Sequence, residues 1–104
     1  MSGLSGEERA LLEPITRAPI LERTLAWAAI NSGTGNLDGL EAMAHRLADA
    51  FAALPGKVRL VDPAPVESVD AKGNPCVVAH GRHLVLSVRP EAERRVLLTG
   101  HMHT

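Results

Sequence analysis

The chain has 104 residues, which allows one small domain at most. Its apolar fraction is 45%, its charged fraction is 22% and its formal net charge is −1, which argues against disorder of the whole chain. Without a basic excess, a nucleic-acid partner or an anionic-membrane partner has no electrostatic support. No apolar run approaches the ~18 residues of a membrane span, and the acidic first residues do not resemble a secretory signal. The single cysteine, Cys76, cannot form an internal disulfide, so we expect a cytoplasmic chain.

The first third of the sequence predicts a short lead-in followed by a helix. Residues 1–18 are small, charged and interrupted by proline, and we expect a loose lead-in with room for a turn of helix. Pro19 suits the first position of a helix, where its missing N–H costs nothing. The sequence of residues 20–30, ILERTLAWAAI, continues that helix with an apolar stripe.

A second helix is predicted after a polar turn. The segment NSGTGN, residues 31–36, ends the first helix because glycine and asparagine tolerate the left-handed backbone. Asp38 is the expected N-cap of the second helix, and Glu41 completes a capping box. Pro55 and the glycine that follows it end this helix. Its apolar residues recur at helical spacing: Leu40, Ala44, Leu47, Phe51 and Leu54.

The second half of the chain predicts strands. Residues 57–61 are strand-like, residues 62–75 contain three prolines and predict a surface loop, and residues 77–79 allow a short strand. Residues 83–89 and 94–99 are predicted to form a hairpin around the turn between them. The predicted class is therefore α/β: two helices, then a strand and a hairpin.

The end of the sequence carries the residues best suited to chemistry. His101 and His103 form an H-x-H pattern after the apolar run of residues 96–98, which predicts a strand covered on both faces. Residues two apart on a strand face the same side, so both imidazoles can enter one crevice. Imidazole nitrogen suits zinc, copper or nickel.

Two segments resemble a known enzyme family. The sequence VLLTGHMHT resembles the strand ending in G-H-x-D-T of the zinc-dependent aminoacylase, acetylornithine deacetylase and glutamate carboxypeptidase family. Upstream, WAAINSGTGNLDGL resembles the preceding segment of glutamate carboxypeptidase-like members. The resemblance covers residues 19–104 and implies the N-terminal part of a three-layer catalytic domain with a mixed central sheet. In that case the chain stops after the first metal-ligand motif, and any homodimer would need a domain that lies outside it.

The resemblance also implies a reaction and roles for two residues. Family members cleave amide bonds of N-acyl amino acids or dipeptides with a free carboxylate, using one or two zinc ions, with cobalt as a possible substitute. His101 stands at the first zinc-binding histidine. His103 replaces an aspartate that accepts a hydrogen bond from that histidine and orients it. A neutral imidazole brings no negative charge to this position, and losing such an orienting group typically costs about 10–100-fold in metal affinity or activity.

Two other interpretations remain open. The family's remaining ligands have no counterpart in this sequence, so we expect the chain alone to be inactive and to aggregate or behave as a molten state. A non-catalytic remnant or interaction module is one alternative. A small histidine-based metal-binding protein is the other: if Arg89 pairs with Arg94, antiparallel register places His80 opposite His103 and near His101.

Overall fold

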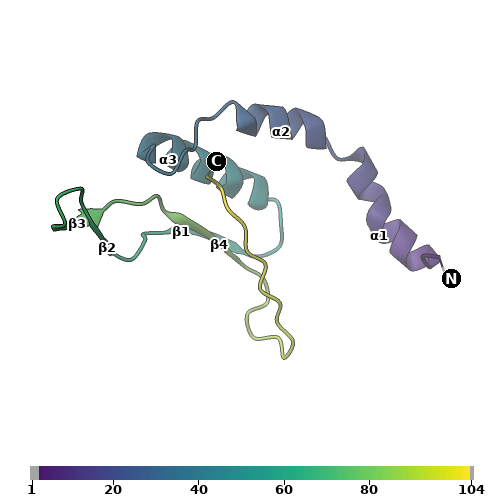
Figure 1. The fold of residues 1–104 in the computed structure, drawn as a ribbon. Coiled ribbons are helices and arrows are strands. Elements are labelled where there is room, and N and C mark those ends of the chain that lie inside the picture. The colour runs from purple at the N-terminus through teal and green to yellow at the C-terminus, as the bar shows by residue number, and fades with distance from the viewer. Residues whose placement is uncertain (1–2, 104) are drawn as a thin grey trace.

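The computed structural model describes residues 3–103, which form three helices followed by four strands. In chain order these are α1 (Gly6–Arg17), α2 (Ile20–Ala28), α3 (Leu37–Phe51), β1 (Lys57–Val61), β2 (Val66–Val69), β3 (Pro75–Val78) and β4 (His83–Ser87). The strands make two antiparallel two-stranded sheets, β1 with β4 and β2 with β3 (Figure 1). The chain is thus a small α/β protein, as predicted, but residues 3–103 contain no mixed sheet.

The core lies where α3 packs against the β1–β4 sheet. The helical stripe predicted from the sequence turns Leu40 and Ala44 inward, and these two side chains are 6% and 0% exposed. The other three predicted stripe residues stay partly or largely exposed. This core is small for a chain of this length, so few contacts hold the helix to the sheet.

The first two helices form an arm that extends away from this core (Figure 1). Neither α1 nor α2 contains a buried residue. The radius of gyration is 18.4 Å, whereas a compact chain of this size has about 13 Å. The extended arm accounts for part of this difference.

Helix α1 occupies most of the segment for which a loose lead-in was predicted. Its start is fixed by a capping box, in which the Glu8 amide donates to Ser5 Oγ at 3.1 Å and the Ser5 amide donates to Glu8 Oε2 at 2.7 Å. The helix then continues through Pro14 to Arg17. The S-x-x-E signal is present in the sequence, but the prediction for residues 1–18 did not take it into account.

Helix α3 begins after a different N-cap residue from the one predicted. Asn36, rather than Asp38, is the N-cap, and its side-chain oxygen accepts a hydrogen bond from the Gly39 amide at 3.0 Å. The Asn36 side-chain Nδ2 also donates to the Asn31 carbonyl at 3.0 Å. The two asparagines therefore connect the segment after α2 to the start of α3. Glu41 takes no part in the cap and makes a different contact, described below.

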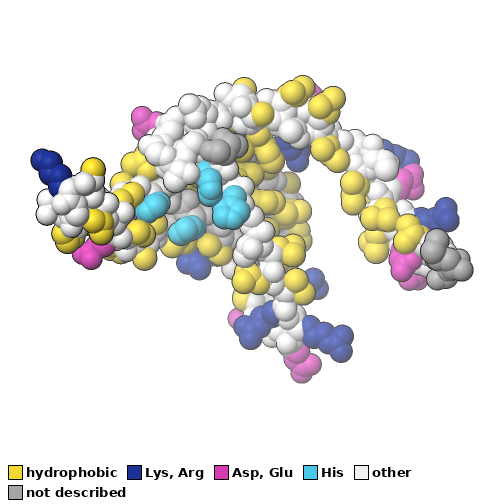
Figure 2. All heavy atoms as spheres, viewed as in Figure 1, with side chains coloured by type: hydrophobic (Ala, Val, Ile, Leu, Met, Phe, Trp, Pro, Cys, Tyr) yellow, Lys and Arg dark blue, Asp and Glu magenta, His cyan; other side chains and the backbone are white. Residues whose placement is uncertain are grey.

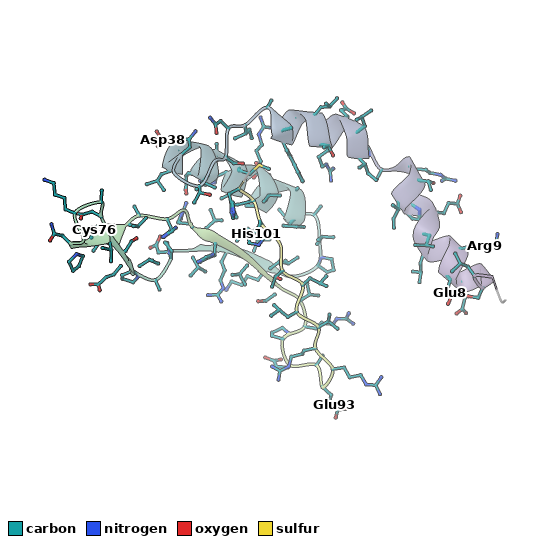
Figure 3. All side chains as sticks on the ribbon, in the orientation of Figure 1. Glu8, Arg9, Asp38, Cys76, Glu93 and His101 are labelled. Atoms are coloured by element: carbon teal, nitrogen blue, oxygen red, sulfur yellow. The ribbon has the colours of Figure 1, made fainter. Side chains whose placement is uncertain are left out.

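The strand pairing also differs from the predicted hairpin. β4 pairs with β1, with Val61 opposite His83, and residues 94–99 form no strand. The segment predicted as a surface loop contains β2, which pairs with β3 across a turn where Asp70 Oδ1 accepts from the Lys72 and Asn74 amides. In Figure 3 the labelled Cys76 lies on this hairpin, and Glu93 lies at the tip of the loop after β4. The predicted turn is present in this loop, where the Ala92 amide donates to the Arg89 carbonyl at 3.1 Å, but the strand expected after it is not.

The apolar run of Val96, Leu97 and Leu98 is consequently uncovered. Its three side chains are 85%, 86% and 89% exposed, in place of the two-sided burial that the sequence predicts. Its expected strand partner, β4, pairs with β1 on one edge, and residues 94–99 do not join the other edge. The run is therefore the largest departure from the predicted fold.

Candidate functional site

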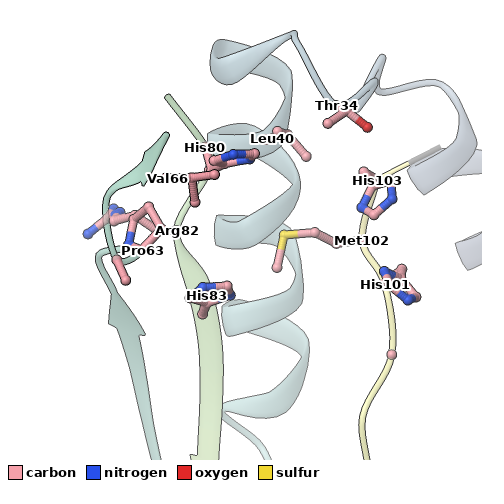
Figure 4. Close-up of a pocket in the computed structure, with 13 residues that line it drawn as sticks. Thr34, Leu40, Pro63, Val66, His80, Arg82, His83, His101, Met102 and His103 are labelled. Atoms are coloured by element: carbon pink, nitrogen blue, oxygen red, sulfur yellow. The ribbon is translucent and has the colours of Figure 1, made fainter. Parts of the chain in front are cut away.

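The candidate site is a cavity of about 510 Å³ at one end of α3 (Figure 4). Five parts of the chain line it: the turn after α2, the start of α3, the segment that leads into β2, and two stretches that carry histidines. The histidine-bearing stretches are residues 80–83 and residues 100–103, which we call the C-terminal segment. The cavity thus brings together residues that are distant in the sequence.

Four of the chain's five histidines lie around this cavity: His80, His83, His101 and His103. Figure 2 shows the histidine side chains gathered on one face of the molecule. The hairpin register that predicted the approach of His80 to His103 is wrong, because residues 94–99 form no strand beside β4. His80 and His103 nevertheless both line the cavity. Within residues 3–103 no three His, Cys, Asp or Glu side chains form a group that could hold a metal ion.

His101 and His103 lie side by side, as their spacing predicts. Their ring centroids are 4.9 Å apart and the ring planes meet at 82°, an edge-to-face arrangement. Both side chains are exposed, whereas Met102 between them is half-buried. A metal ion can therefore reach either imidazole without any rearrangement of the core.

His80 is the least satisfied polar group of the site. Its Nε2 atom is buried and has no hydrogen-bond partner among the described residues. A buried polar atom without a partner costs free energy, and such groups are uncommon in folded proteins. His80 lines the cavity, but its Nε2 is not open to the cavity, so a ligand would reach this atom and remove the penalty only after the ring or the wall moved.

One wall of the cavity is held by an ion pair that the sequence analysis missed. Arg82 donates its Nε to Glu41 Oε2 at 3.1 Å and its Nη2 to Glu41 Oε1. His45 Nε2 lies 3.1 Å from the same Oε1. The pair joins α3 to the segment before β4, where a side chain on Gly81 would press against Leu40. The two partners are 41 residues apart, so no local pattern predicts their contact.

This ion pair makes stability depend on pH. The hydrogen bond from Arg82 lowers the pKa of Glu41 below its usual value of 4.5. The folded state therefore holds this proton less tightly than the unfolded state, and the contribution is present above pH ~4.5 and lost as pH falls through the lowered pKa. We expect Glu41→Gln to lower the urea midpoint at pH 7 and to match the unsubstituted chain in strong acid. Glu67→Gln on the exposed β2 is the control. An equal gap at both pH values would contradict this role.

Comparison of the chain with protein-family models, curated proteins and solved structures finds no match. None of the helices in residues 3–103 combines the length and apolarity needed to cross a membrane. Fold and site together define a small α/β protein with a histidine-lined cavity. A proposal for its function therefore depends on its own residues and their geometry.

Proposed function

We propose that the chain forms the N-terminal part of the catalytic domain of a zinc-dependent amide-bond hydrolase of the aminoacylase, acetylornithine deacetylase and glutamate carboxypeptidase family. The observation that carries the proposal is that both motif-bearing segments line one cavity. Thr34 comes from NSGTGN, and residues 100–103 come from GHMHT (Figure 4). The two segments are far apart in the sequence, so local chain geometry does not bring them together. The substrates proposed are N-acyl amino acids or dipeptides with a free carboxylate.

The site fits zinc in part. His101 offers an exposed imidazole, the kind of ligand that zinc accepts. Residues 3–103 do not supply the three protein ligands that a catalytic zinc site requires, so the remaining ligands would come from residues outside them. Zinc, or cobalt in its place, would polarise the substrate carbonyl and activate water. The role proposed for this chain is to hold the metal through His101.

His103 has the orienting role in this proposal. It stands where the family has a carboxylate, and its ring lies against that of His101. A carboxylate there would accept a hydrogen bond from the ligand histidine and make it more basic, whereas a neutral imidazole adds no charge. His103 would therefore weaken the metal site relative to the family pattern.

The proposal is tested by joining the chain to the remaining ligand segments of a family catalytic domain. The measurements are zinc content and hydrolysis of N-acetyl amino acids. We expect His103→Asp to raise kcat/KM by about 10–100-fold and His101→Ala to remove zinc and activity together. His45→Ala, an exposed histidine on α3, is the control. A hybrid that stays equally active with His101→Ala would overturn the assignment.

A second candidate is a non-catalytic interaction module. The exposed apolar run of residues 96–98 and the arm of α1 and α2, which buries no side chain, favour it. Large exposed apolar patches commonly mark protein–protein contacts. The two candidates differ in a simple respect. The hydrolase requires His101 for its function. The interaction module, acting as an isolated chain, requires the apolar run of residues 96–98 instead.

A further inference from the structure

The cavity contains a sulfur donor that the zinc proposal does not use. Met102 is half-buried between two exposed histidines. In Figure 4 its side chain extends from the C-terminal segment into the cavity, with His80 and His83 on the opposite side. From these placements we propose that the cavity binds monovalent copper through the Met102 thioether and the His80 and His83 imidazoles.

The donor set favours this ion. Among the described residues that line the cavity none carries a carboxylate, which disfavours magnesium, calcium and manganese. Thioether sulfur is a soft ligand that selects Cu(I), and imidazole also suits copper. Cu(I) is satisfied by two or three donors. A site with two histidines and one methionine is therefore sufficient, although no group of three His, Cys, Asp or Glu residues is present in residues 3–103.

His80 supplies an independent observation. Its Nε2 is buried, and no described residue satisfies it. Coordination of a cation by a neutral imidazole nitrogen would use its lone pair and remove the cost of burial without a partner. A purely structural histidine at this place would be expected to have a protein partner, as His45 has in Glu41.

The C-terminal segment can move to close the site. The cavity is larger than one ion fills, so the sulfur and the two rings must approach one another. No backbone hydrogen bond holds residues 100–103 to the rest of the described chain. The segment can therefore shift toward α3 without breaking a sheet. Copper binding is then expected to order the end of the chain.

The test is a competition titration of Cu(I) against bicinchoninate, without oxygen and with a reductant, using the whole chain. We expect about one Cu(I) per chain. Met102→Leu and His80→Ala should each weaken binding by more than about tenfold, because loss of a direct ligand should exceed the smallest losses seen for groups that only orient a ligand. Met43→Leu and His45→Ala on α3 are the matched controls and should bind as the unsubstituted chain does.

Two further measurements separate loss of a copper ligand from loss of structure or of metal binding in general. Met102→Leu conserves volume, so its circular dichroism spectrum should match that of Met43→Leu. The zinc affinity of Met102→Leu should be unchanged, because zinc sites use histidine, thiolate and carboxylate. Copper binding by Met102→Leu at full strength, or an equal loss of copper and zinc, would overturn the proposal. His101→Ala separates the two metals: it tests the zinc ligand and should leave Cu(I) binding intact.

Discussion

Gly39→Ala is expected to be the most destabilising single substitution at a glycine of the described chain. A methyl group at this position would overlap the backbone carbonyl of Asn31 and crowd the Asn36 amide nitrogen. The first obstacle is backbone, so it cannot be relieved by rotating a side chain. The same glycine also donates its amide to Asn36 Oδ1 at 3.0 Å, so moving it away breaks the cap of α3.

The expected loss follows from these two effects. Overpacking costs about 1–3 kcal/mol, and loss of an N-cap costs about 1 kcal/mol. A total of about 3 kcal/mol would lower the melting temperature of a domain of this size by about 12–24 °C, because each 1 kcal/mol shifts it by about 4–8 °C. Because α3 carries Leu40 and Ala44, the two buried apolar side chains, the loss should disturb the whole core.

The measurement is a urea or thermal melt followed by circular dichroism. Gly35→Ala is the matched control, since a methyl group there meets nothing within 4 Å. We expect Gly35→Ala to melt close to the unsubstituted chain. Equal midpoints for Gly39→Ala and the unsubstituted chain would show that the α2–α3 turn does not have the close packing described above.

The helices were largely predictable because their signals are local. The apolar periodicity of residues 20–30 and of the segment around Leu40 and Ala44 places α2 and α3 within a few residues of their observed bounds. The choice of N-cap failed because Asn36 and Asp38 are both good caps. The sequence does not reveal that the Asn36 side chain can also donate to the Asn31 carbonyl, a contact within the α2–α3 turn that favours Asn36 as the cap.

The strand pairing was less predictable because it depends on distant partners. Residues 83–87 form a strand as expected, but their alternation does not specify whether β1 or residues 94–99 is the partner. Pairing with β1 places the strand beside α3, where Leu40 and Ala44 can be covered. The predicted hairpin would use the other edge of β4, which has no strand beside it among the described residues because residues 94–99 form none.

The proximity of His101 and His103 in the candidate site was predictable from the sequence, but the residues that surround them were not. The H-x-H spacing predicts that His101 and His103 share a side, and their rings lie 4.9 Å apart. The contributions of His80 and Met102 depend on how the C-terminal segment folds back over α3, which no local pattern specifies. The Glu41–Arg82 pair was missed for the same reason.

Substitution of the apolar run is expected to change the association state of the chain. Three consecutive apolar side chains are 85–89% exposed, and the backbone of residues 96–98 has no strand partner among the described residues. Apolar surface gains about 25 cal/mol per Å² when it leaves water, and an open extended segment pairs readily with another chain. We therefore expect the unsubstituted chain to form assemblies that grow with concentration.

The variant that tests this carries Val96→Thr, Leu97→Lys and Leu98→Thr. It should remain monomeric in light scattering after size-exclusion chromatography, because a charge in the run opposes both burial and edge pairing. Leu11→Lys is the control: this side chain is 76% exposed, but its backbone lies within α1 and offers no open strand edge. It should associate as the unsubstituted chain does.

The two outcomes lead to different views of the molecule. If assembly disappears only in the triple variant, the run is a surface that needs a cover, as both the hydrolase and the interaction module require. An unsubstituted chain that stays monomeric at every concentration would contradict this prediction. The run would then be tolerated in water, the interaction module would lose its main support, and the histidine-lined cavity would remain as the feature that needs a function.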